Sequence, residues 1–299
     1  MSWLFITILA YFLFAANQTT DKFLLSKPIP NAIAYTFYEG ALSIVALIFV
    51  PFSTLIIPRL ITISFIAGIL HLFGLYAFFS ALRKMEASRA VSLIGALMAV
   101  FSFYLAFIIL GENLNSYQYM AFLCLIIGGI VISYERKKIC YNIEALKFIL
   151  LAALLFASSD VFMKFVFLKS NHFWGGFIWS RFGAFLISFL FLIPQRNRRE
   201  IFSIAGTTGT GISLLFLVNK SIAGTAFILK NFALKVSSQI SLVNALQSTQ
   251  FAFVFGLTTL LSYKLPKILK EEINYYVIFQ KIFAIFLIAL GFLILAIFK

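Results

Sequence analysis

The chain has 299 residues, of which 62% are hydrophobic and only 11% are charged, and its mean hydropathy is +1.02. A soluble domain of this length needs a more charged surface, so this composition excludes an ordinary soluble protein. The formal net charge of +14 does not predict nucleic-acid binding, because the basic residues form short clusters between apolar blocks, as they do in loops at a membrane surface.

The apolar residues form long blocks, and blocks of about 18 or more such residues predict membrane-spanning helices. Barrel strands would instead show a two-residue alternation, which segments such as 121–133 lack. We therefore predict an all-α polytopic membrane protein with ten transmembrane helices. The expected spans are about residues 3–25, 31–52, 61–82, 89–110, 116–134, 146–168, 173–194, 208–231, 237–262 and 274–298.

Turn-forming residues separate these spans. SKPIPN (26–31) follows the first span, and GENLNS (111–116) separates the fourth from the fifth. The most polar gap is ERKKICYNIEALK (135–147), near the middle of the chain. It predicts a linker between two five-helix units, residues 1–138 and 139–299.

Two similar phrases suggest that the second unit repeats the first. LFAANQTTDKF (13–23) matches LFASSDVFMKF (155–165) when Lys22 is placed on Lys164. After a small shift in register, SLIGAL (92–97) meets SLVNAL (241–246), and His71 stands opposite Lys220. Shared composition alone could also produce such matches. A repeated unit of five spans must cross the membrane in opposite directions, so we predict two inverted five-helix repeats.

One segment of the first unit carries a recognisable pattern. In AFFSALRKMEASRAVSLIGALMAVFSFYLAFIILGENLNSYQYMAFLCLIIGGIVIS (77–133), the informative positions are Ala81-Leu82, Ser88, Gly111-Glu112 and Gly128-Gly129. They resemble the third-to-fifth helix signature of EamA-type members of the drug/metabolite transporter superfamily. The resemblance implies ten helices built as five plus five, a transporter function, and an integral protein of a bacterial or archaeal plasma (inner) membrane.

Ionisable side chains inside apolar spans usually face a cavity or a partner. Glu39 and Arg181 are predicted to form a pair across the two units or a substrate clamp, with a structural ion pair or interfacial charges as alternatives. His71 is either a proton-linked switch or a neutral hydrogen-bonding side chain. Lys220 requires a carboxylate, an anionic substrate or deprotonation.

Other polar side chains also fall inside the spans. Asp160 and Lys164 have the i, i+4 spacing of a helix-face pair, which is either self-contained or part of the site. Glu112 is expected to cap or orient a loop. The predicted substrate-binding or coupling residues are Asn17, Glu39, His71, Asp160, Arg181, Lys220, Asn244 and Gln247. No catalytic residue, metal or other cofactor is expected.

These residues favour a secondary transporter, an exporter or exchanger, that moves a small polar or amphipathic metabolite by alternating access. Its partners are then a small-molecule solute and the lipid bilayer, and a homodimer is one option for its assembly. A flippase for a lipid-linked substrate is the alternative. An enzyme is not expected, because His71 and His172 are far apart and no paired acidic motif exists.

Charge distribution and family resemblance predict opposite orientations of the chain in the membrane. The loop lysines and arginines would place both termini outside by the positive-inside rule, whereas the resembled family usually has both termini in the cytoplasm. An even number of spans keeps the termini together in either case.

Overall fold

The computed structural model describes residues 2–26, 31–85, 87–133, 143–207, 209–264 and 275–297. Within these ranges the secondary structure is helical. The first half contains α1 (Ser2–Ser26), α2 (Ala32–Leu42), the 3₁₀ helix η1 (Ser43–Phe52), α3 (Pro58–Lys84), α4 (Ala87–Leu110) and α5 (Ser116–Ser133). The second half contains α6 (Ile143–Ser170), α7 (Phe173–Ser188), the 3₁₀ helix η2 (Phe189–Leu192), α8 (Gln195–Thr207), α9 (Thr210–Val236), α10 (Ile240–Ala245), α11 (Gln247–Lys264) and α12 (Tyr275–Ile297).

Eight helical segments in the described ranges are long and apolar enough to cross a membrane. Two shorter apolar helices, Ser116–Val131 and Ile282–Ile297, accompany them. These helices agree with a polytopic membrane protein, and the count of ten spans stays a prediction. The predicted unit boundary at residue 138 lies outside the described residues, as do several of the basic loop residues on which the predicted orientation depends (Lys27, Arg136, Lys137, Lys138, Lys267 and Lys270).

Local chemistry sets where several helices begin. The Asn31 side chain accepts hydrogen bonds from the backbone N–H groups of Ile33 (2.8 Å) and Ala34 (3.2 Å), so it caps α2. Pro58 begins α3, where the missing N–H costs nothing. Gly111 has a φ of +67° just after α4, a conformation that glycine adopts without strain.

Three expected spans differ in detail from the structure. The second and seventh change from α to 3₁₀ winding, at Ser43 and Phe189. The ninth is interrupted at Leu246, between α10 and α11. The basic segment after Pro194, which reads as a loop in the sequence, forms the helix α8.

Glycines allow two pairs of helices to approach closely. A Cβ atom at Gly68 of α3 would lie 1.8 Å from the Ser180 carbonyl oxygen of α7, and a Cβ atom at Gly183 would lie 2.5 Å from the Phe65 carbonyl oxygen. Gly128 of α5 lies similarly close to α12. Small residues of this kind let helix backbones touch in a membrane, where van der Waals packing drives association.

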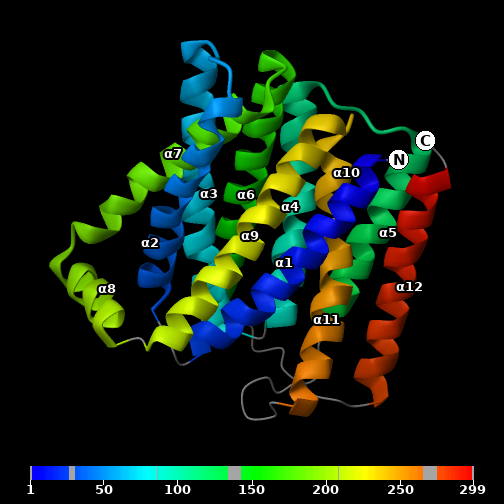
Figure 1. Ribbon diagram of the computed structural model, residues 1–299. Coiled ribbons are helices and arrows are strands. Elements are labelled where there is room, and N and C mark those ends of the chain that lie inside the picture. Colours follow the sequence, from blue (N-terminus) through cyan, green and yellow to red (C-terminus); the bar gives the residue numbers. More distant parts are fainter. Residues whose placement is uncertain are drawn as a thin grey trace.

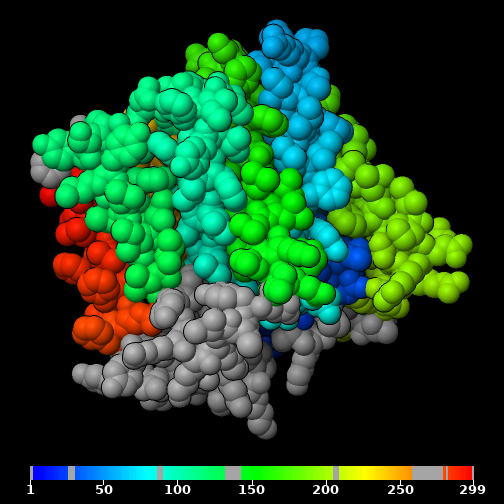
Figure 2. Space-filling view, turned by 180° about the vertical axis from the view of Figure 1, so that it is seen from behind, coloured from blue at the N-terminus to red at the C-terminus, as the bar shows by residue number. Residues whose placement is uncertain are grey.

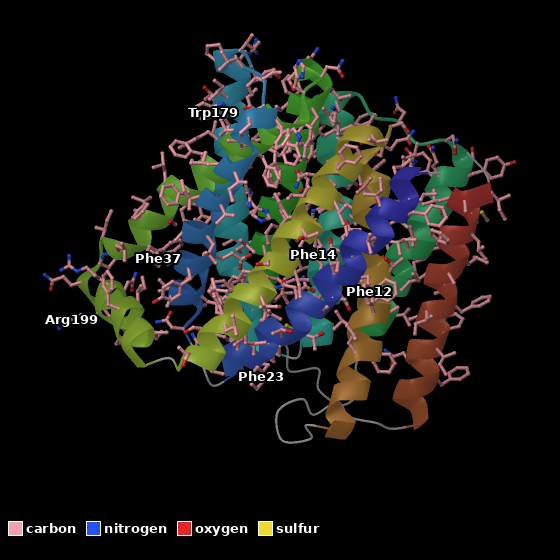
Figure 3. The ribbon with its side chains drawn as sticks, viewed as in Figure 1. Phe12, Phe14, Phe23, Phe37, Trp179 and Arg199 are labelled. Atoms are coloured by element: carbon pink, nitrogen blue, oxygen red, sulfur yellow. The ribbon has the colours of Figure 1, made fainter. Side chains whose placement is uncertain are left out.

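The helices form one bundle, with the start of α1 and the end of α12 at the same end (Figure 1). α1 and α9 cross one face of the bundle, and α3 to α6 cover the opposite face (Figures 1 and 2). α8 lies at one edge of the bundle beside α2 (Figure 3). The Tyr38 hydroxyl of α2 donates to the Ile201 carbonyl of α8 (2.6 Å). The Arg199 side chain of α8 points away from the bundle (Figure 3).

Candidate functional site

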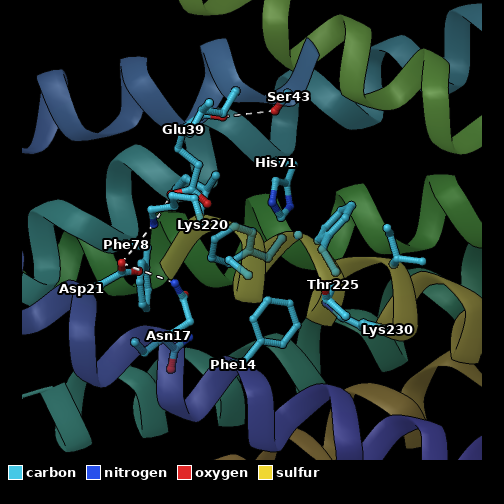
Figure 4. Close-up of a pocket in the computed structure, with 18 of the residues that line it drawn as sticks. Phe14, Asn17, Asp21, Glu39, Ser43, His71, Phe78, Lys220, Thr225 and Lys230 are labelled. Atoms are coloured by element: carbon cyan, nitrogen blue, oxygen red, sulfur yellow. Dashed lines mark hydrogen bonds and ion pairs between the residues drawn. The ribbon is translucent and has the colours of Figure 1, made fainter. Parts of the chain in front are cut away.

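A cavity of about 490 Å³ lies in the middle of the bundle. Its wall comes from α1, α2 with η1, α3, α4, α6, α7, α9 and α11, so both halves of the chain contribute (Figure 4). Six of the eight predicted site residues line it: Asn17, Glu39, His71, Arg181, Lys220 and Gln247. Asp160 and Asn244 do not line it. Asp160 binds the lining residue Lys230, and Asn244 donates a hydrogen bond to Ser102.

Lys220 of α9 is the centre of the first charge cluster. Its ammonium lies 3.0 Å from Asp21 Oδ1 of α1 and 2.8 Å from Glu39 Oε2 of α2. The same Asp21 oxygen accepts hydrogen bonds from the Tyr35 hydroxyl and from the Asn219 amide (2.6 Å). The sequence left a carboxylate, an anionic substrate or deprotonation as alternatives for Lys220. The structure shows two carboxylates, those of Asp21 and Glu39.

Glu39 and Arg181 do not form the predicted cross-unit ion pair. Glu39 extends toward Lys220 instead, and its side chain remains 20% exposed. The sequence offset placed Glu39 and Arg181 at matching positions of α2 and α7, but matching positions in two helices need not bring their side chains together.

Arg181 is nine-tenths buried and lines the cavity. Its guanidinium carbon lies 4.0 Å from the centre of the Phe227 ring, which is a cation–π contact, and one terminal nitrogen reaches the Ser180 hydroxyl at 3.5 Å. Its Nε atom is buried without a hydrogen-bond partner among the described residues. A buried donor of this kind is costly unless a ligand or water satisfies it.

Asp160 of α6 binds Lys230 of α9, with 2.6 Å between Oδ2 and Nζ. Both side chains are almost fully buried. The i, i+4 spacing suggested Lys164 as the partner of Asp160, and this interpretation was wrong. Lys230 lines the cavity and was missed in the sequence, because it stands next to the end of the predicted span 208–231, where a lysine ordinarily extends to the membrane surface.

Lys164 of α6 instead caps the C-terminal end of α9. Its ammonium donates to the carbonyl oxygens of Leu234 (2.7 Å) and of the C-cap residue Ser237, at the end of the helix where carbonyl groups lack intrahelical partners. Lys22 of α1 does the same for α3, with the carbonyls of Leu82 and Met85 as acceptors. The two lysines that match in the sequence therefore make equivalent contacts.

This equivalence also corrects the register between the two units. α3 and α9 each contain 27 residues, and a lysine caps each at the same point. Aligned end to end, they place Gly68 opposite Lys220 and Phe78 opposite Lys230. The sequence-based register, which placed His71 opposite Lys220, is therefore shifted in these helices.

Most of the amide side chains at the cavity form hydrogen bonds between helices, and the carbonyl oxygen of Gln247 does not. The Asn17 amide reaches the Asn219 carbonyl (3.3 Å), and the Gln250 amide donates to Gln18, so these amides join α1 to α9 and α11. Asn244 donates to the Ser102 hydroxyl (2.7 Å). In Gln247 the carbonyl oxygen is buried on the cavity wall without a partner among the described residues.

His71 faces aromatic neighbours in the cavity. Its ring centre lies 5.2 Å from that of Phe156 and 4.6 Å from that of Phe227, the ring that also carries Arg181. Within the described residues, no group of three or more metal-ligating side chains exists.

Glu112 lies in the loop between α4 and α5, outside the spanning helices, and contacts the second half of the chain. It accepts hydrogen bonds from the Ser241 hydroxyl (3.2 Å) and from the backbone N–H groups of Ile240 and Ser241, which begin α10. The capping role was predicted, but the capped element is a distant helix. Burial raises the pKa of Glu112 from its usual 4.5 to about 7.

Residues 1–134 match the EamA-like transporter family. A solved structure titled "Crystal structure of protein" is similar in fold, with a TM-score of 0.66 over 98% of this chain and 96% of that chain at 17% sequence identity. Among curated proteins, none matches this sequence. The apolar helices and this match support the resemblance seen in the sequence: this is an integral membrane protein whose residues 1–134 are similar to the EamA-like transporter family of the drug/metabolite transporter superfamily.

Proposed function

We propose that the protein is a secondary transporter that moves a small amphipathic organic anion, such as an aromatic or aliphatic carboxylate, by alternating access around the central cavity. The observation that carries this proposal is that Arg181 lines the cavity without an ion-pair partner among the described residues. Lys220 and Lys230 are each held by a carboxylate, whereas Arg181 forms no ion pair within 4 Å among the described residues. Its buried Nε donor is left for a ligand.

The cavity around Arg181 suits a substrate with one charged end. A guanidinium binds a carboxylate through two parallel hydrogen bonds. Phe14, Phe156, Phe177 and Phe227 line the neighbouring wall and suit an apolar body. The wall combines both halves of the chain, which is what exchange of packing between two inverted units requires. Export or exchange as the direction stays a prediction of the sequence.

Binding tests the anion site directly. The purified protein in lipid nanodiscs is titrated with benzoate, phenylacetate and butyrate, and with the corresponding neutral amides, while its thermal unfolding is followed. A ligand that binds the folded state raises the unfolding temperature. We expect stabilisation by the carboxylates and little by the amides. Arg181→Gln should weaken carboxylate binding by about 10-fold to 100-fold, as expected for a lost charge-assisted hydrogen bond.

Arg59 provides the matched control. It is an exposed arginine at the start of α3, so Arg59→Gln should leave binding unchanged. Equal stabilisation by carboxylates and amides, or an Arg181→Gln variant that binds as the wild type does, would overturn the anion site.

Transport is tested in proteoliposomes. Radiolabelled carboxylate should enter faster when unlabelled carboxylate is present on the opposite side, because an alternating-access protein returns faster when loaded. A labelled lipid that changes leaflet in the same vesicles, without solute flux, would favour the flippase instead.

A further inference from the structure

The central cavity reaches the side of the helix bundle, between α2–η1 and α9. On α9, Leu217, Ser221, Gly224 and Thr225 line the cavity and are also exposed. On η1, Val45 lines the cavity and is 52% exposed. We call this opening, bordered by these five residues, the side window.

The side window lies within the membrane-spanning part of both elements. Ser221, Gly224 and Thr225 occupy the middle of the span Thr210–Val236, and Val45 lies inside the span Ala32–Phe52. An opening at this depth faces acyl chains rather than water. An apolar chain in the bilayer therefore lies next to the side window.

The chemistry of the rim suits hydrocarbon. The Ser221 hydroxyl donates to the Leu217 carbonyl (2.9 Å), and the Thr225 hydroxyl donates to the Ser221 carbonyl (3.0 Å), so neither donor is left for lipid to satisfy. At Gly224, an added Cβ atom would meet nothing within 4 Å, which shows that the rim is open at this position.

The wall of the same cavity also carries polar groups. Arg181 and Gln247 are each nine-tenths buried on its wall, and the Arg181 Nε donor and the Gln247 Oε1 acceptor have no hydrogen-bond partner among the described residues. Thr225 lies at the side window and Phe14 and His71 lie on the cavity wall (Figure 4). One cavity therefore combines unsatisfied polar groups on its wall with an apolar opening.

We infer that the substrate carries a flexible apolar tail and reaches the cavity sideways from the bilayer, with its carboxylate at Arg181 and its tail in the side window. This inference rests on the proposed anion transport and specifies its substrate class as long-chain amphipathic carboxylates.

A plug at Gly224 tests the side window. The space around Gly224 is open, so Gly224→Trp can fold while filling the opening with its indole ring. Gly211 offers the matched control, because it belongs to the same helix, is also open within 4 Å, and does not line the cavity. Both variants and the wild type are titrated in nanodiscs with butyrate and with dodecanoate.

We expect Gly224→Trp to weaken dodecanoate binding by 10-fold or more, as an order of magnitude for displacing several buried methylene groups. Butyrate binding should change by less than about 2-fold, because its short chain stays inside the cavity. Gly211→Trp should affect neither ligand. Unchanged dodecanoate binding in Gly224→Trp, or equal loss for both ligands, would overturn the side window.

A second measurement separates this inference from the anion site. A phospholipid with a photoreactive diazirine midway along its acyl chain is incorporated into nanodiscs with the wild type, and labelled residues are mapped by mass spectrometry. Labelling of inner-wall residues such as Phe156 or His71 supports the side window, even when no carboxylate binds. Labelling confined to outward-facing residues such as Leu214 and Val218 overturns it, even when carboxylates do bind.

Discussion

The two halves of the chain agree at their helix ends and differ in the cavity between them. Lys22 and Lys164 each donate to the terminal carbonyls of a long helix, α3 in one half and α9 in the other. In and next to the cavity, the same alignments place Gln18 opposite Asp160, Phe78 opposite Lys230, and Glu39 opposite Arg181. The lysine hydrogen bonds to helix-end carbonyl groups are therefore repeated in both halves, whereas the charged residues at the cavity are not.

This difference has a physical reason. A helix that ends inside a membrane leaves carbonyl groups that need donors, whatever the protein transports. The cavity has no such general requirement, so its charges can follow the substrate. The comparison predicts that helix-end residues act mainly on stability, and that the unpaired cavity residue acts mainly on binding.

The largest effect is expected at the ion pair that only the second half has. Asp160→Asn leaves Lys230 buried without its carboxylate, which should lower the free energy of unfolding by about 3–5 kcal/mol. Chemical denaturation in detergent measures this change. The double variant Asp160→Asn with Lys230→Met should recover most of the loss. Glu144→Gln, in the surface pair with Lys84, should cause no measurable change. A double variant as unstable as the single one would show that the charge balance is not the cause.

The contribution of each lysine cap to stability should increase with the burial of its side chain. Lys164 is 2% exposed, whereas Lys22 is only partly buried and can be replaced by water more easily. Lys164→Met should therefore lower the free energy of unfolding by about 2–3 kcal/mol and Lys22→Met by about 1–2 kcal/mol, the range for hydrogen bonds from charged donors. The same denaturation assay compares the two variants. A larger loss in Lys22→Met would break the equivalence between the halves.

Glu112 should make stability depend on pH. Its pKa rises from 4.5 to about 7 on folding, so the folded state retains a proton that the unfolded state has lost. The contribution is complete below about pH 4.5 and is lost as the pH rises through 7, with an upper limit of about 3 kcal/mol. The unfolding temperature of the wild type should fall between pH 5 and pH 7.5, and that of Glu112→Gln should fall less. Parallel curves would show that Glu112 does not contribute.

The smallest effect on stability is expected at Arg181. It has no ion pair to lose among the described residues, and its removal relieves a buried charge, so Arg181→Gln should change the free energy of unfolding by less than about 1 kcal/mol. The denaturation assay without ligand measures this value. A loss as large as that of Asp160→Asn would assign Arg181 to structure and would weaken the contrast between the two kinds of residue.

The sequence predicted the class of the protein and its family well, because apolar blocks of this length are typical of membrane helices and the pattern around Gly111-Glu112 is distinctive. It also identified Lys22 and Lys164 as equivalent, since both keep their position relative to the neighbouring residues. It could not assign partners inside the bundle. Asp160 has a lysine one turn away on its own helix, yet it pairs with Lys230 of another helix, and only the packing of α6 against α9 decides between them.

Two other differences have simple causes. The run QRNRR has the composition of a loop, yet it forms the first turn of α8, which Tyr38 and Asn31 contact further along at Ile201 and Glu200. Lys230 stands beside the end of its predicted span, where a lysine ordinarily extends to the membrane surface. Its burial follows from the greater observed length of α9, which continues to Val236.

The 3₁₀ winding of η1 has a consequence for the thickness of membrane that this segment can cross. A 3₁₀ helix rises about 2.0 Å per residue and an α-helix about 1.5 Å, so the ten residues of η1 extend about 5 Å further than they would in α winding. Residues 32–52 would span about 31 Å as one α-helix, which equals the hydrocarbon thickness only if the helix is not tilted. With η1 the same residues span about 36 Å, so this segment can lean across the bilayer and still reach both surfaces.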